Sequence, residues 1–167
     1  TFTNFMIMTA GDPATAGLWL RLSHPAGALA ICVCIDFAWT FPERIEYMSR
    51  RSRLMLYGMG MLFGMVALAP NLYSSITLQP GPLRVVNVQY GPAFVPFALF
   101  IVVALGYADF ILLRKVFTLR GLQRVQIVYV LVGLAATHLV AMVTIAVIPL
   151  VWGTTAYSGW GAGGFIL

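Results

Sequence analysis

The chain has 167 residues, of which 60% are hydrophobic and only 9% are charged, and its mean hydropathy is +0.90. Soluble domains carry about 25% charged residues, so one soluble core of this size could not hide this much apolar surface. The net charge of +5 does not indicate nucleic-acid binding, because the basic residues gather in two short gaps between apolar runs. The composition therefore predicts one all-α polytopic membrane bundle over residues 1–167, with the lipid bilayer as its solvent.

Four apolar runs are each long enough to span a bilayer, which needs about 20 residues. The first predicted helix covers about 14–41, because Asp12 is a suitable N-cap and the proline after it suits a first turn. Three further complete helices are predicted at about 54–78, 90–113 and 125–150. Apolar segments near both ends of the chain indicate partial flanking helices.

The second predicted helix carries Gly60 and Gly64, four residues apart. Small residues at this spacing allow the backbone of a neighbouring helix to approach closely. We therefore expect these two glycines to mark a helix-packing face.

Two connections between the predicted helices, loops 42–53 and 114–124, carry four basic residues each. The connection between the second and third helices carries only Arg84. The positive-inside rule therefore places both basic loops on the cytoplasmic side of a bacterial inner membrane. Because Lys115 falls in the second basic loop, no lysine is expected deep in a span, and a retinal Schiff base is not expected.

Arg21 and His24 lie within the first three turns of the first predicted helix, near its outer boundary. Interfacial anchoring is one interpretation, because an arginine side chain can extend its charge to the interface. The other is an outward-facing pocket that takes an anionic headgroup or ligand. His138 lies about 20 Å into the membrane from Arg124 at the helical rise, and it is the third candidate ligand-binding residue.

Three interpretations of His138 remain open. It can be a neutral histidine that hydrogen-bonds to a neighbouring helix, a residue of the ligand pocket, or an axial ligand of a haem or chlorophyll. His24 is the only other histidine and would have to complete a bis-histidine haem site. No cofactor is required by the sequence, and no metal-site spacing or catalytic motif is present.

Asp36, Asp109 and Arg114 lie near the predicted cytoplasmic face and are candidates for structural ion pairing. Asp109 and Arg114 are five residues apart, which is a poor spacing for a pair on one helix. We therefore expect pairing between helices, with Arg44, Arg53 or Arg124 as partners. A proton or ion path is the alternative.

Two segments resemble a known family. "GLWLRLSHPAGALAICVCIDFAWTFPER" (17–44) has Trp-x-Arg near the outer end, then an apolar run and a closing aromatic-Pro. "RVQIVYVLVGLAATHLVAMVTIAVIPLVWGTTAYSGWGAGGFIL" (124–167) has a charged-Gln entry, a glycine, a threonine, then Pro and a Gly-rich run. Both resemble helices of the seven-transmembrane N-terminal sensor region of bacterial histidine kinases. The chain departs from the family at the apolar residues around Thr144, and it contains no phosphorylation or nucleotide-binding segment.

The resemblance implies a membrane-embedded sensory module that binds an unknown ligand in its outer half and relays a helix displacement to a cytoplasmic output domain. The alternative is an accessory structural subunit of a respiratory or photosynthetic membrane complex, which would contact pigment, quinone or lipid. Neighbouring transmembrane helices of the same or another chain are the expected partners. A transporter ranks third, because no internal repeat is visible. We expect no catalytic activity in this chain.

Overall fold

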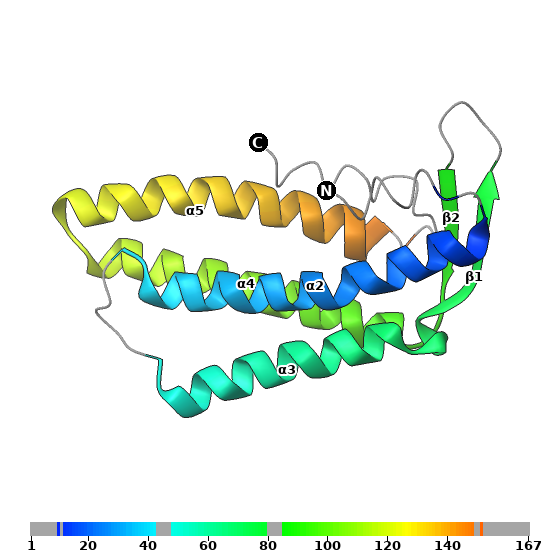
Figure 1. Ribbon diagram of the computed structural model, residues 1–167. Coiled ribbons are helices and arrows are strands. Elements are labelled where there is room, and N and C mark those ends of the chain that lie inside the picture. The colour runs from blue at the N-terminus through cyan, green and yellow to red at the C-terminus, as the bar shows by residue number, and fades with distance from the viewer. Residues whose placement is uncertain (1–9, 11, 43–47, 80–84, 149–150, 152–167) are drawn as a thin grey trace.

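In the computed structural model, the described residues form four long helices that lie side by side, and a two-stranded hairpin crosses one end of them (Figure 1). The structure describes residues 10, 12–42, 48–79, 85–148 and 151. The helices are α2 (Pro13–Thr40), α3 (Arg50–Leu68), α4 (Phe94–Thr118) and α5 (Gly121–Ala141). A π-helix, η2 (Met142–Val147), continues α5. A 3-10 helix, η1 (Pro70–Leu72), joins α3 to strand β1 (Tyr73–Gln79), which pairs antiparallel with β2 (Val85–Tyr90).

The start of α2 follows from its first residues. The Asp12 carboxylate accepts hydrogen bonds from the Thr15 backbone N–H at 2.9 Å and from the Thr15 hydroxyl at 2.7 Å. Pro13 occupies the first helical position, where a missing N–H has no consequence. Ser49 caps α3 in the same way, because its hydroxyl accepts from the Ser52 N–H at 3.1 Å.

The two ends of the bundle differ in charge. At one end α2 and α4 finish and α3 and α5 begin (Figure 1). We call it the basic end, because it carries Arg50, Arg51, Arg53, Arg114, Lys115, Arg120 and Arg124. The opposite end, covered by β1 and β2, is called the hairpin end.

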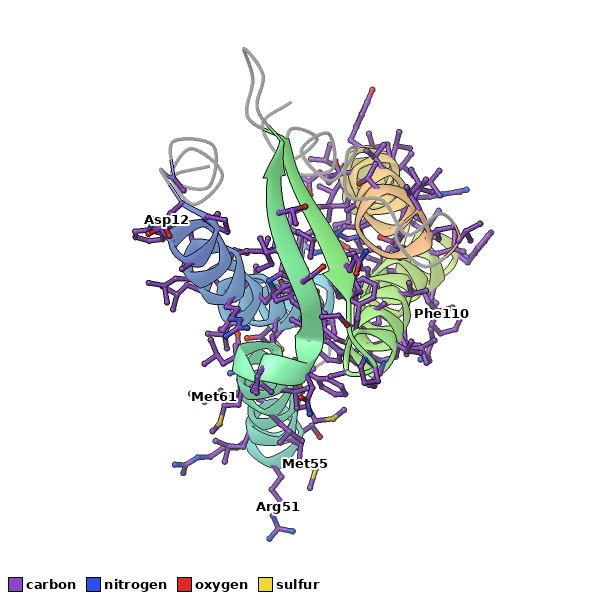
Figure 2. All side chains as sticks on the ribbon, turned by 90° about the vertical axis from the view of Figure 1, so that its right-hand side faces the viewer. Asp12, Arg51, Met55, Met61 and Phe110 are labelled. Atoms are coloured by element: carbon purple, nitrogen blue, oxygen red, sulfur yellow. The ribbon has the colours of Figure 1, made fainter. Side chains whose placement is uncertain are left out.

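Helix α2 packs against both α3 and α4, and α4 packs against α5. The buried core includes Phe97, Leu112 and Ile127. Many large apolar side chains are nevertheless exposed, and Met55, Met61 and Phe110 point away from the bundle (Figure 2). An outer surface of this kind suits contact with lipid or with further helices.

The expectation of four complete spans is confirmed only in part. Within the described residues, three stretches are long and apolar enough to cross a membrane: Pro13–Thr40, Phe94–Thr118 and Gly121–Thr144. Helix α3 is not among them, because its first turn carries Arg50, Arg51 and Arg53 and it ends after 19 residues at Leu68. The molecule is mostly helical, as predicted.

The second predicted helix is wrong beyond Leu68. Ala69 takes an extended conformation, because a residue before proline is driven out of the helical region. The residues predicted as the outer third of this helix instead form η1 and β1. The all-α description is therefore also wrong at the hairpin, where 73–79 pairs with 85–90.

The other predicted boundaries are also shifted. The third helix begins at Phe94 instead of residue 90, because Tyr90 ends β2. The basic loops are shorter than predicted, since α3 already begins at Arg50, α4 continues to Thr118 and α5 begins at Gly121. Arginine and lysine are good helix formers, so basic residues did not mark the helix ends. The end of the fourth helix, predicted at residue 150, lies outside the described residues.

Candidate functional site

A polar and aromatic cluster lies at the hairpin end, where α2, β1 and α4 meet. β1 begins at Tyr73, immediately after η1, and the Gly91 N–H donates to the Leu72 carbonyl at 2.8 Å. This bond holds both strands close to the start of α4. Tyr73 is thereby buried against α2, with its hydroxyl directed at His24.

Both ring nitrogens of His24 have partners. Nδ1 lies 2.7 Å from the Leu20 carbonyl, which can only accept, so Nδ1 carries the proton and donates. Nε2 is then left to accept from the Tyr73 hydroxyl at 2.9 Å. The imidazole also lies 5.1 Å from the Phe97 ring of α4, measured between centroids. His24 is thus fixed in orientation by two helices and one strand.

Arg21 lies one turn before His24 on α2, and its Nε is buried without a hydrogen-bond partner among the described residues. An N–H of a guanidinium group that is removed from water costs free energy unless an acceptor reaches it. The side chain as a whole is only partly buried. The Arg21 Nε–H is therefore a donor at this end that can still bond to an acceptor atom of a ligand.

Tyr73 and Tyr90 are the two tyrosines of the hairpin, and both are shielded from water by the surrounding protein. Burial raises the pKa of Tyr73 far above its usual range, and the nearby Arg21 charge opposes this effect only weakly. Burial also raises the pKa of Tyr90, which stacks on Phe94 with ring centroids 3.7 Å apart. Both tyrosines are thus neutral hydrogen-bonding groups at any physiological pH.

His138 does not join Arg21 and His24. It is fully buried on α5, and its Nδ1 lies 2.8 Å from Asp109 Oδ1 on α4. His24 contacts α4 at Phe97, twelve residues before Asp109, which is about 18 Å along a helix. The two histidines are therefore too far apart to ligate one haem iron. No group of three or more potential metal-ligating side chains occurs within the described residues.

The carboxylates pair between helices. Asp36 of α2 accepts from Arg53 Nε at 3.1 Å and from the Tyr57 hydroxyl at 3.4 Å, both on α3. Asp109 contacts a histidine instead of the arginines named as its partners. Arg114 forms no ion pair with any described residue, and Arg44 lies outside the described residues.

Lys115 was wrongly placed in a loop, and its role was missed. It is a buried residue of α4, and its Nζ donates to the carbonyls of Ala38 at 2.9 Å, Trp39 at 2.7 Å and Phe41 at 2.7 Å. These carbonyls belong to the C-terminal end of α2, where a helix accumulates partial negative charge. The only signal for this contact in the sequence was a lysine two residues beyond the predicted end of an apolar run.

Gly60 and Gly64 do face α2. A Cβ at Gly60 would overlap the sulfur of Cys32, and one at Gly64 would lie 3.1 Å from Cα of Pro25. The absence of side chains at these two positions thus allows α3 to pack closely on α2.

Apolar exposed helices, a basic end and a polar hairpin end together define a membrane-embedded helical domain. Residues 1–163 match the family model described as the N-terminal 7TM region of histidine kinase, and the chain belongs to this family. It is accordingly a membrane sensory input module, a region distinct from the catalytic part of such kinases. No curated protein and no solved structure matches the chain.

Proposed function

We propose that this sensory module detects a ligand at its hairpin end, and that Arg21 contacts it while the hydrogen bonds of His24 hold this turn of α2 in position. The ligand carries a carboxylate, phosphate or other strong acceptor. The proposal rests on one observation: Arg21 Nε is buried and has no hydrogen-bond acceptor among the described residues. Arg21 lies one helical turn from His24, whose hydrogen bond with Tyr73 joins this part of α2 to β1.

Helix α2 can carry the signal across the membrane. It holds Arg21 and His24 near the hairpin end, and near the basic end it is bonded to α3 through Asp36 and to α4 through Lys115. A displacement of α2 would therefore be transmitted to both neighbours. The ligand shifts this equilibrium only by its difference in affinity for the two positions of α2.

The orientation follows from charge. We propose that the basic end faces the cytoplasm of a bacterial cell and the hairpin end faces outward. After Cys32 and Cys34 are replaced by alanine, a single cysteine at Ser75 in β1 or at Arg120 before α5 tests this orientation with a membrane-impermeant maleimide in intact cells. Labelling at Ser75 alone is expected, and labelling at Arg120 alone would reverse the orientation.

The binding proposal is tested in the complete kinase, with phosphorylation measured under conditions that change the output of the wild-type protein. Arg21→Gln and His24→Gln are expected to abolish the response while the protein remains in the membrane. Arg51→Gln is the matched control, because Arg51 points away from the bundle at the basic end (Figure 2). An unchanged response in both Arg21→Gln and His24→Gln would exclude this site.

The parent reading frame gives an independent check of the family role. A kinase region encoded after Leu167 is expected for a sensory input module. A stop codon soon after Leu167 would instead favour an accessory subunit of a larger membrane complex.

A further inference from the structure

A cavity of about 300 Å³ opens at the basic end, far from Arg21 and His24. Its lining combines Trp39 of α2 with Tyr107, Phe110, Arg114 and Thr118 of α4. The volume is at the lower end of the range of small-molecule sites, about 300–1,000 Å³.

The α4 residues of this cavity share one helix face, because they follow one another at intervals of three or four residues. Since α4 runs from the hairpin end to the basic end, Tyr107 lies about 10 Å deeper in the bundle than Arg114. The cavity therefore has a charged mouth at the basic end and an aromatic wall that leads from it toward the middle of the bundle.

The aromatic wall is open to the surroundings of the protein. Tyr107 is 45% exposed and Phe110 is 60% exposed, and Phe110 points outward from α4 (Figure 2). In a membrane these rings face acyl chains. A free anion from water would gain nothing from such a wall, whereas a lipid would occupy the mouth and the wall together.

The mouth provides hydrogen-bond donors and positive charge. The Arg114 side chain is exposed and forms no ion pair with a described residue. Trp39 Nε1 is buried and has no hydrogen-bond partner among the described residues. Beside them, the Lys115 ammonium is held against carbonyls of α2. Asp36 and Asp109 contact Arg53 and His138, so neither neutralises Arg114.

We propose that this cavity binds the phosphate headgroup of an anionic phospholipid of the leaflet at the basic end. Arg114 and Trp39 Nε1 donate to the phosphate oxygens, and one acyl chain lies against Tyr107 and Phe110. A bound lipid bridges the end of α2, which carries Trp39, to α4, which carries Arg114. The composition of this leaflet would then adjust the contact through which α2 passes its displacement. The site is independent of the ligand at the hairpin end.

The test uses the full chain with Trp39 as the sole tryptophan, obtained by Trp19→Phe, Trp152→Phe and Trp160→Phe. It is reconstituted into phosphatidylcholine vesicles that contain increasing fractions of phosphatidylglycerol. Bromine atoms, which quench indole fluorescence, are placed on the acyl chains either of phosphatidylglycerol or, in matched vesicles, of phosphatidylcholine. One basic contact near a membrane surface contributes about 1 kcal/mol, which is about a fivefold enrichment of anionic lipid. Trp39 emission is expected to fall to half at a certain fraction of brominated lipid. This fraction should be about fivefold lower when the bromine is on phosphatidylglycerol than when it is on phosphatidylcholine.

Arg114→Gln is expected to remove this preference. Arg124→Gln is the matched control, since Arg124 lies at the same end but lines a separate groove with Val125, Val128 and Tyr129 of α5. Equal quenching by the two lipids would overturn the proposal. If Arg124→Gln removed the preference as completely as Arg114→Gln, the proposal would also be overturned, because the preference would then come from the overall positive charge of the basic end. Loss of the preference in millimolar inorganic phosphate would instead assign the cavity to a free anion and would also overturn it.

Discussion

His138 Nδ1 and Asp109 Oδ1 lie 2.8 Å apart and join α5 to α4 inside the bundle. His138 is completely buried, whereas the Asp109 side chain is 22% exposed. The other ring nitrogen, Nε2, has no hydrogen-bond partner among the described residues. Since α5 buries few other side chains, this polar contact is a main specific link between the two helices.

Replacing the pair by leucines measures this link. Polar contacts between membrane helices contribute about 0.6 kcal/mol on average and reach about 1.7 kcal/mol. We expect a coupling energy of about 1 kcal/mol from a double-mutant cycle of His138→Leu and Asp109→Leu, measured by unfolding in mixed micelles. Val132→Ala on an exposed face of α5 is the control. A coupling energy near zero would mean that the contact does not stabilise the α4 and α5 pair.

A second prediction concerns the glycine face of α3. Gly60→Ala and Gly64→Ala are each expected to destabilise the bundle by about 1–3 kcal/mol, because an added methyl group meets Cys32 or Pro25 of α2. Gly58→Ala on the same helix is the matched control, since nothing lies within 4 Å of a Cβ there. Equal effects at all three positions would show that helix propensity, and not packing, dominates.

Lys115 provides a third prediction. Lys115→Met keeps most of the side-chain volume but removes the donor to three α2 carbonyls, so a loss of about 2 kcal/mol of stability is expected. Hydrogen exchange at the last turn of α2 should increase at the same time. The control Arg124→Gln should leave that exchange unchanged, because the Arg124 side chain is exposed on α5. No change in Lys115→Met would mean that water satisfies the same carbonyls.

The cap of α2 is predicted to depend on pH. The N–H and hydroxyl of Thr15 hold the pKa of Asp12 below its model-compound value of 3.8. A lowered folded-state pKa stabilises the helix above the unfolded pKa, and this stabilisation is lost as the pH falls through the lower folded-state value. Protection of the Thr15 amide from hydrogen exchange should therefore decrease below about pH 4. Asp12→Asn, which still accepts but does not titrate, should show no such decrease.

The fifth prediction is a colourless preparation. A macrocycle ligated by His138 needs open space beside the imidazole, and the whole His138 side chain is buried by protein, in contrast to the partly exposed Arg21 and Trp39. Both ring nitrogens of His24 already have partners. The purified chain in mild detergent should therefore show no Soret or chlorophyll band. A band that disappears in His138→Ala would refute this prediction and would restore the pigment-holding subunit as the function.

The sequence by itself determined the membrane class, the family resemblance and three apolar spans, because these depend on composition and on runs of residues along the chain. It also indicated that Gly60 and Gly64 form a packing face, since their spacing is local. The hairpin was missed because pairing of 73–79 with 85–90 needs a partner strand, and the apolar part of 73–79 looks like a continuation of the preceding helix.

Only the tertiary structure decided which polar groups meet. Arg21 and His24 lie one turn apart on one helix, so their proximity was predictable. The contacts of His138 with Asp109, of Lys115 with the end of α2 and of His24 with Tyr73 join separate elements. Such contacts depend on the rotation, depth and tilt of each helix relative to its neighbours, which are set by packing and are not encoded in the period of any one segment.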